Sequence, residues 1–564
     1  MKVLFVFFTD PPRPFSSSVA ALSAVARVEG HAPDALEVSC KGSVAAAADE
    51  IVRRGPDVVA VSSMSRDWPG ARAVLERVRP RSRAFVVVGG YHATLASLDV
   101  AACAAVDAIA IGEGERPLAS LLRTLAAGEV PRTQPGLWAR SRDGGFEGAP
   151  PEAAPEPDIA RLPPWDYEVF GDVQAILREG VNTFGPHVDR FLPVRASRGC
   201  PYECAYCSAP AWGEVGGHRR PGRVNVRPVE HLLGELAVLR DHYAPEGFEF
   251  WDEHFPISVD WLRALARAYP RRVGLPFKVE MHPSAATRER LALLAEAGCV
   301  LFHAGVEAGD EALRRDVLRR RTPDAVLERV FEDCRALGLA TSASLMTMLP
   351  GETRAQMVST KALLEKLRPG SFVWSTYQPL PGTRLGDAAV RAWPAPARER
   401  LDDHPPLETT TPACVSAAER EETFRELAAL QTALVAATSE GRAARARPVD
   451  VPATAAAPPP GLVELLGLEA PSAPLDRGVR LNAAAWRGGV VTLELEAVDL
   501  APHAVTIGAN DGGRFYRATP QLGLSYRGRA APPRLLSTLD SIAARLDGLG
   551  PDDLARLFAG EGAS

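Results

Sequence analysis

The chain has 564 residues, and this length predicts about three or four domains rather than one. Its 64 Lys and Arg stand against 70 Asp and Glu, so the formal net charge is −6 and the chain lacks the basic surplus typical of proteins that bind nucleic acid or anionic membranes. Apolar residues make up 46% and charged residues 24%, which excludes a disordered chain and leaves ample material for buried cores.

The cysteine content and the N-terminus both bear on the compartment. The eight cysteines are too few and too unevenly spaced for a disulfide-linked scaffold, which predicts a reducing environment. The N-terminal segment MKVLFVFFTDPP has an apolar run that is too short for a signal peptide or a membrane span. We therefore expect a cytoplasmic protein with no membrane and no nucleic-acid partner.

The first part of the chain alternates apolar runs with helical patterns. The runs are rich in β-branched residues, as in strands buried on both faces of a parallel sheet, and they lie at 3–8, 58–62, 85–88 and 107–111. Helical spacing occurs between them, at 17–28 and 70–79. The pattern predicts a doubly wound, Rossmann-like α/β domain over residues 1–130, with a ligand crevice at the carboxyl ends of its strands.

The rest of the chain divides by composition into further segments. A Pro-rich connector is expected at 131–190, and a second α/β unit, a partial barrel, at 191–405. The expected barrel strands lie at 191–196, 246–251, 276–281, 300–306, 341–348 and 371–377. We then expect a helical extension at 406–443, a Pro/Ala-rich linker at 444–475, and a small C-terminal α+β domain of unknown role at 476–564.

Three cysteines crowd into one loop after a predicted strand. Cys200, Cys204 and Cys207 form a C-x3-C-x2-C pattern in SRGCPYECAYCSAP. Three soft thiolates suit an iron–sulfur cluster or zinc. Structural zinc prefers four closed ligands, for which His218 is the nearest candidate, whereas a cubane cluster held by three cysteines leaves one iron open to bind another molecule. Three buried cysteines with no metal are the remaining alternative.

This loop, with Tyr206 before the last cysteine, resembles the cysteine loop of the radical S-adenosylmethionine (radical SAM) superfamily. The resemblance implies that Cys200, Cys204 and Cys207 hold a 4Fe–4S cluster. It also implies that the open iron chelates the amino and carboxylate groups of S-adenosylmethionine. Reductive cleavage then yields a 5′-deoxyadenosyl radical inside a partial α/β barrel.

Further segments resemble the same family, in the expected order. EFWDEHF resembles the end of the second barrel strand, where Asp252 and Glu253 are expected near the methionine amino group. HAGVEAGDEAL resembles the G-V-E-S-G segment, with Glu307 as a cofactor contact. MLPGET resembles the G-L-P-G-E-T turn, with Met348 in place of its first glycine. The alternative for these carboxylates is a helix cap or a surface position.

Two glycine-containing loops follow strands of the first domain. GGYHAT and GEGERPL resemble the cobalamin-binding domain that precedes the barrel in one radical SAM subgroup, the class B methyltransferase-like enzymes. Two glycines after a strand let the backbone approach a flat ligand. The resemblance implies cofactor contacts from Gly89, Gly90, Gly112, Glu113 and Gly114.

One departure from that subgroup concerns the lower face of the cofactor. Many cobalamin domains have a D-x-H-x-x-G loop whose histidine binds cobalt, whereas the corresponding loop here reads SCKGSVAAA. We therefore expect cobalamin without a histidine lower ligand. Met64 and Arg66, in SSMSRDW, are candidates for the position beneath the corrin; the alternative for Arg66 is an ion pair with Asp67.

These features predict a cobalamin-dependent radical SAM enzyme that methylates an unactivated carbon of a small metabolite or peptide-derived precursor. Its expected cofactors are a 4Fe–4S cluster, S-adenosylmethionine and cobalamin, with an external electron donor such as flavodoxin or ferredoxin. The sequence singles out no general base. The alternatives are a radical SAM cyclase, rearrangement enzyme or oxidoreductase without methyl transfer, and a zinc-stabilised binding or regulatory protein.

Overall fold

The computed structural model describes residues 1–9, 15–39, 43–156, 158–179, 190–215, 224–392, 419, 422–431 and 433–434, and four strands between 479 and 518. The chain divides into two compact units, Met1–Ala436 and Ala437–Ser564. Each unit is described by itself.

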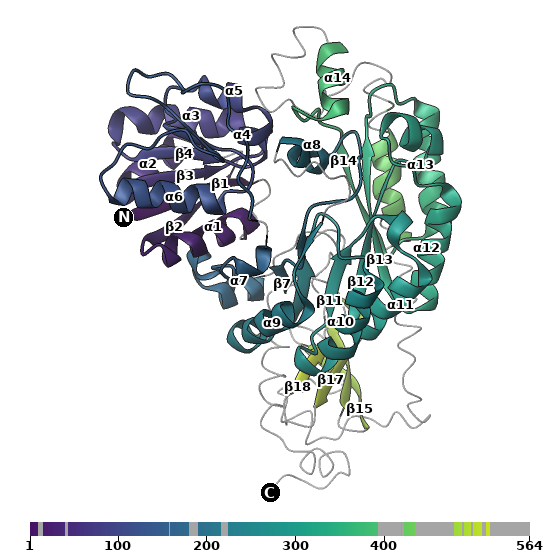
Figure 1. The fold of residues 1–564 in the computed structure, drawn as a ribbon. Coiled ribbons are helices and arrows are strands. Elements are labelled where there is room, and N and C mark those ends of the chain that lie inside the picture. The colour runs from purple at the N-terminus through teal and green to yellow at the C-terminus, as the bar shows by residue number, and fades with distance from the viewer. Residues whose placement is uncertain are drawn as a thin grey trace, which may run out of the picture. The chain divides into compact units, whose positions relative to one another are not determined.

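The N-terminal sheet has the strand order β2-β1-β3-β4-β5-β6. Figure 1 labels β1, β2, β3 and β4 of this sheet. The first five strands are parallel, and β6 pairs antiparallel to β5. The strands are β1 (Lys2–Thr9), β2 (Ala32–Ser39), β3 (Val58–Ser62), β4 (Phe85–Gly89), β5 (Ala108–Ala110) and β6 (Leu137–Ala139). The helices are α1 (Ser17–Val28), α2 (Val44–Arg54), α3 (Trp68–Val78), α4 (Tyr91–Leu95), α5 (Ser97–Ala101) and α6 (Glu115–Ala126).

Both faces of this sheet are buried, which confirms the predicted doubly wound domain. Successive side chains of a strand point to opposite faces, so β1 contributes to two cores. Leu4 and Val6 pack in a core with residues of α2 and α3, whereas Val3 and Phe5 pack in a core with residues of α1 and α6. The continuous apolar run was therefore correctly predicted to be a strand that is covered on both faces.

Two strands of this sheet were not predicted. β2 has the sequence APDALEVS, which lacks an apolar run because it is an edge strand, and all of its residues except Val38 are half-buried or exposed. An edge strand also tolerates a proline such as Pro33. β6 lies within the predicted connector, which further contains α7 (Val173–Glu179).

The second sheet has the order β14-β13-β12-β11-β10-β7, and its strand pairs are parallel. The strands, at the predicted places, are β7 (Phe191–Val194), β10 (Gly247–Phe250), β11 (Phe277–Glu280), β12 (Cys299–Glu307), β13 (Ala340–Thr347) and β14 (Ser371–Thr376). One face packs on helices (Figure 1), namely α9 (Val229–Tyr243), α10 (Val259–Arg272), α11 (Arg288–Ala297), α12 (Asp324–Ala336) and α13 (Arg354–Leu367). This curled half-barrel confirms the predicted partial barrel.

The opposite face of the barrel sheet is polar at several positions. Glu249 and Lys278 are neighbours in register and form a buried ion pair. Glu280, His303, Ser342 and Ser371 follow one another in register across the next row. Most of these polar side chains are buried, so this face forms a polar interior opposite the helix-covered face.

The cysteine loop begins after β8 (Ser197–Arg198) and ends at α8 (Ser208–Val215). β8 pairs antiparallel with β9 (Asn225–Val226). The last labelled helix of this unit is α14 (Arg384–Ala392), and residues 422–431 are also helical, within the predicted extension.

The C-terminal unit contains an antiparallel sheet, within the α+β domain expected at 476–564. Its strands are β15 (Val479–Arg487), β16 (Val490–Ala497), β17 (Leu500–Ala509) and β18 (Phe515–Ala518). The predicted linker at 444–475 lies outside the described residues, as do residues 519–564 of the expected C-terminal domain. Among the described residues, no helix is both long and apolar enough to cross a bilayer.

Candidate cofactor site

A cavity of about 1040 Å³ is lined by residues of the N-terminal domain and of the barrel. Its wall includes the residues that follow β1, β3, β4 and β5, together with the cysteine loop and the end of β10. This volume is at the upper end of the range for small-molecule and cofactor sites, about 300–1,000 Å³. The carboxyl ends of parallel strands therefore meet at one site, as expected for both fold types.

Most of the predicted site residues line this cavity. They are Cys200, Cys204, Cys207, Met64, Arg66, Gly89, Gly90, Gly112, Glu113, Gly114 and Glu253. Asp252 and Glu307 do not line it. The structure thus brings together the two groups of motifs that the sequence separates by about a hundred residues.

The three cysteine thiols lie in a largely buried environment. Cys204 is buried, while Cys200 and Cys207 are half-buried. Burial raises the pKa of Cys200 to about 11 and that of Cys207 to about 12. Since thiolates are the metal ligands, metal binding at this loop must displace protons from these thiols.

The arrangement of donors bears on the choice between a cluster and a single ion. Across the residues that the structure describes, no three His, Cys, Asp or Glu side chains already surround one point where an ion would bind. In a cubane cluster each cysteine binds a different iron, so the three sulfurs need not converge. Three cysteine ligands leave one iron of such a cluster open, whereas structural zinc prefers four closed ligands. His218, the candidate fourth zinc ligand, lies outside the described residues.

The two carboxylates after β10 have different environments. Asp252 is buried and accepts hydrogen bonds from Ala196 N at 3.1 Å and Ser197 Oγ at 2.5 Å. Burial raises the pKa of Asp252 to about 7. Asp252 therefore braces the segment between β7 and β8, and of the predicted pair only Glu253 lines the cavity.

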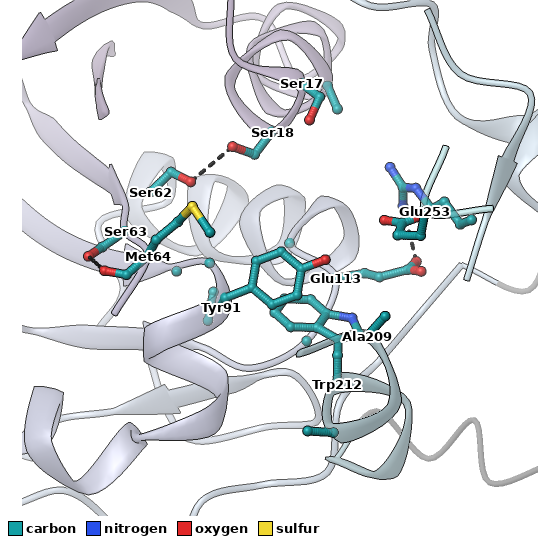
Figure 2. A pocket seen from close by; sticks show the side chains of 18 of the residues that line it. Ser17, Ser18, Ser62, Ser63, Met64, Tyr91, Glu113, Ala209, Trp212 and Glu253 are labelled. Atoms are coloured by element: carbon teal, nitrogen blue, oxygen red, sulfur yellow. Dashed lines mark hydrogen bonds and ion pairs between the residues drawn. The ribbon is translucent and has the colours of Figure 1, made fainter. Parts of the chain in front are cut away.

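Glu253 supports the backbone immediately before the first cysteine. Its Oε2 accepts a hydrogen bond from Gly199 N at 3.2 Å, and its Oε1 lies 3.6 Å from Arg195 Nη2. The carboxylate thus orients the entrance to the cysteine loop while facing the cavity (Figure 2).

Glu307 lies at an irregularity of β12, behind the cavity wall. The register with β13 shifts between Gly305 and Glu307, and Glu307 has a positive φ of 72°, which is uncommon for a non-glycine residue. Burial raises the pKa of its carboxyl, and Arg320 and Tyr206 partly offset this effect. Strained, buried polar residues of this kind gather at functional sites.

Met348 also has a positive φ, of 61°, and is buried. This is the position where the resembling G-L-P-G-E-T turn has glycine, which adopts such a conformation without steric cost. The turn is kept nonetheless, because Glu352 Oε2 accepts a hydrogen bond from Leu349 N at 3.0 Å. Met348 therefore places a buried side chain at a position with a positive φ.

Arg320 is a site residue that the sequence reasoning missed. Its Nη1 lies 3.5 Å from Cys204 Sγ and 3.4 Å from Tyr206 Oη. It belongs to the run LRRDVLRRRT, which contains five arginines with no pattern that marks one of them as buried. The π-helical turn Leu313–Val317 and the positive φ of Arg319 turn the next residue inward.

The glycines of the N-terminal wall are required by the backbone. Gly90 has φ 96°, and a Cβ there would lie 2.8 Å from Ser63 O. Gly112 has φ 78°, and a Cβ there would collide with Ala153. At both turns the backbone therefore borders the cavity with no side chain in between.

The predicted lower-face residues also border the cavity. Met64 is 44% exposed and its side chain is drawn among those of the cavity wall (Figure 2). Arg66 Nε donates a hydrogen bond to Asp67 Oδ1 at 3.2 Å, which is the ion pair expected as the alternative. Arg66 still lines the cavity, so the pair orients its side chain and does not remove it from the site.

A hydroxyl-rich wall, which was not predicted, and an aromatic pair complete the cavity. Serines 16–18 and 62–63 line it, and Ser18 Oγ lies 2.9 Å from Ser62 Oγ (Figure 2). The rings of Tyr91 and Trp212 lie with their centroids 4.7 Å apart. The repeated serines in SSS and SSMS were the available signal for the polar wall.

Comparison with known protein families assigns both halves of this site. The radical SAM superfamily model matches residues 194–364, and the B12 binding domain model matches residues 15–122. The protein is a radical SAM enzyme with a B12-binding domain. The two matches contain the cysteine loop and the glycine turns, respectively.

Individual relatives are distant. An uncharacterized methyltransferase of Pyrococcus horikoshii is 25% identical over 340 residues, which are 59% of this chain and 70% of that protein. The anaerobic magnesium-protoporphyrin IX monomethyl ester cyclase of Cereibacter sphaeroides is 25% identical, over 60% of this chain and 54% of that protein. The structure of the radical SAM methyltransferase TsrM from Kitasatospora setae, with cobalamin and a [4Fe-4S] cluster bound, has the same fold. Its TM-score is 0.55 at 19% identity, and it covers 75% of this chain and 85% of that one.

The cofactors of these families are a 4Fe–4S cluster, S-adenosylmethionine and cobalamin. The residues that line the cavity of this radical SAM enzyme suit these cofactors. Three thiols face one cavity, a guanidinium lies beside Cys204, and the glycine turns leave the opposite wall open. The prediction of this cofactor set is thereby confirmed.

Proposed function

We propose that this enzyme transfers a methyl group to a carbon atom of a small-molecule or peptide-derived substrate. One observation supports the proposal above the others: the three cysteines and the glycine turns of the B12-binding domain line one cavity. Methyl transfer needs the two cofactors to reach the same substrate atom, and a shared cavity provides that proximity.

The residues of the chain take distinct parts in this proposal. Cys200, Cys204 and Cys207 hold the cluster, and Glu253 orients the backbone before them through Gly199 N. When bound, the three cofactors supply a 5′-deoxyadenosyl radical that abstracts hydrogen from the substrate and a methyl group for the carbon radical that results.

The other walls of the cavity orient the reactants and exclude water. Gly90 and Gly112 let the backbone approach a flat ligand, and the rings of Tyr91 and Trp212 close part of the wall. Excluding water protects a reactive radical from side reactions. A one-electron donor such as flavodoxin or ferredoxin is part of the proposal, as is a cytoplasmic location.

The test is anaerobic reconstitution with iron, sulfide and hydroxocobalamin, followed by incubation with S-adenosylmethionine and a reductant. A methyltransferase forms both 5′-deoxyadenosine and S-adenosylhomocysteine. Formation of 5′-deoxyadenosine without S-adenosylhomocysteine contradicts methyl transfer and favours a cyclase, rearrangement or oxidoreductase reaction. A cyclase is among the relatives, so this outcome decides between the two candidate functions.

The cluster site is tested separately by two matched cysteine variants. Cys204→Ala is expected to lose the cluster, measured as iron content and brown absorbance, and to form no 5′-deoxyadenosine. Cys334→Ala removes a buried thiol from the barrel core and is expected to keep both. Full iron content in Cys204→Ala contradicts the cluster site.

A further inference from the structure

We propose that Arg320 is a positioning residue that makes the cluster easier to reduce, by holding a positive charge and an N–H donor against the sulfur of Cys204. The inference rests on the proposed cluster site at the three cysteines, and it does not depend on methyl transfer. It adds a residue outside every motif that the sequence points to.

The geometry of Arg320 is fixed by its contacts with Gly305 and Cys204. Nη2 and Nε donate to the carbonyl oxygen of Gly305 at 2.6 and 3.1 Å, which anchors the guanidinium to the end of β12. Nη1 is left to face the cysteine loop, 3.5 Å from Cys204 Sγ. The side chain is 7% exposed, so water competes little for these bonds.

The absence of a side chain at residue 305 makes room for this arrangement. A Cβ at Gly305 would lie 2.7 Å from Arg320 Nη2 and would collide with Glu307 Oε1. Gly305 does not have a positive φ, so backbone conformation does not require glycine there. The close approach of the guanidinium and the carboxyl does require it.

The charge on Arg320 is only partly balanced by its neighbours. Glu307 is the nearby carboxyl, and its pKa is raised by burial, so it is less ready than an ordinary glutamate to take a negative charge. The hydroxyl of Tyr206 lies 3.4 Å from Nη1. The sulfur of Cys204, 3.5 Å from Nη1, becomes an anionic partner of Arg320 when a cluster binds.

The consequence for the cluster follows from its charge. Reduction adds one electron from an external one-electron donor, and no bond breaks in this step. Hydrogen bonds to the sulfurs and the local net charge set the potential of such clusters, because they stabilise the more negative, reduced state. In a buried site this stabilisation is stronger than in water. Arg320 should therefore raise the reduction potential.

The test is a potentiometric titration of anaerobically reconstituted wild type, Arg320→Lys and Arg320→Gln, without S-adenosylmethionine. The electron paramagnetic resonance signal of the reduced cluster is followed, and iron and sulfide are measured on each sample. We expect Arg320→Gln to shift the reduction equilibrium at least tenfold toward the oxidised form, which is about 59 mV for a one-electron couple. Arg320→Lys keeps the charge and should shift it less.

The control is Arg321→Gln, which removes the same formal charge from an exposed neighbour and should keep the wild-type potential. A full iron content with a wild-type potential in Arg320→Gln overturns the inference. Loss of the cluster in both Arg320 variants also overturns it, because Arg320 would then serve only to assemble the loop. If wild type itself forms no 4Fe–4S cluster, the proposed cluster site fails before any variant is compared.

Discussion

Arg198 forms an ion pair with Glu115, and this pair connects the strand before the cysteine loop to the first turn of α6. A second carboxylate, Glu113, lies 3.2 Å from the other terminal nitrogen of Arg198. Burial alone would raise the pKa of Glu115, but Arg198 outweighs this effect and holds the pKa below its usual value. The B12-binding domain and the radical SAM domain are therefore joined two residues before Cys200.

Removing Arg198 should destabilise the protein. Arg198→Gln leaves Glu113 and Glu115 without their cation while both remain largely buried, at a cost of about 3 kcal/mol in the free energy of unfolding. Thermal unfolding followed by circular dichroism measures the change. Arg53→Gln breaks an exposed pair with Glu50 and should leave the midpoint unchanged. The double variant Arg198→Gln/Glu115→Gln should regain part of the stability that Arg198→Gln loses. If it does not, the unpaired Glu115 carboxylate is not the cause of the destabilisation.

A side chain at Gly90 should weaken cobalamin binding. Gly90→Ala places a Cβ against Ser63 O in a conformation with φ 96° that is almost restricted to glycine, which costs about 1–3 kcal/mol. The turn must then shift, and about tenfold weaker binding of hydroxocobalamin is expected by equilibrium dialysis. Gly70→Ala, in α3 of the same domain, meets no atom within 4 Å and should bind as wild type does. Equal affinities in all three proteins would show that this turn does not border the cofactor.

A methyl group at residue 305 should weaken the effect of Arg320 on the reduction potential of the cluster. Gly305→Ala keeps every charge, but its Cβ must displace the guanidinium and the Glu307 carboxyl. We expect a potential more negative than wild type, yet closer to it than that of Arg320→Gln, in the same titration. Gly234→Ala, on the open surface of α9, is the matched control. An unchanged potential in Gly305→Ala would mean that the exact position of the Arg320 guanidinium does not affect the reduction potential of the cluster.

The buried carboxyl of Asp252 should make stability depend on pH. Its pKa is about 7 in the folded protein against about 3.9 when unfolded, so the folded state binds more protons between these values. The stability contributed by Asp252 is therefore full below about pH 4 and is lost as pH rises toward 7. Metal-free Asp252→Asn should gain stability relative to metal-free wild type over this range, by at most about 1.4 kcal/mol per pH unit, and no further above pH 7.

The measurement compares thermal midpoints of the two metal-free proteins from pH 4 to pH 8. Asp260→Asn, which changes an exposed carboxylate on α10, is the control and should show no such trend. If the difference in thermal midpoint between Asp252→Asn and wild type stays constant from pH 4 to pH 8, Asp252 is already ionised in the folded protein over this range. That result would contradict the raised pKa.

The amino-acid pattern was sufficient for the two parallel sheets and for the cysteine loop. Runs such as VLFVFF are apolar at every position because both faces of a parallel sheet are covered. Their strands can therefore be predicted from the sequence alone. C-x3-C-x2-C and the paired glycines are local features, whose chemistry depends on neighbours in the chain. The edge strand β2 was missed because edge strands lose this apolar signal.

The direction of each polar side chain depended on residues far away in the chain. Asp252 and Glu253 are adjacent, yet one braces Ser197 and the other faces the cavity, because neighbouring residues at a strand end point to opposite sides. The pairing of Arg198 with Glu115 spans 83 residues, and that of Arg320 with Cys204 spans 116. Such contacts form when separate elements pack together, so no local pattern encodes them, and folding alone selects Arg314 and Arg320 as the buried arginines of their run.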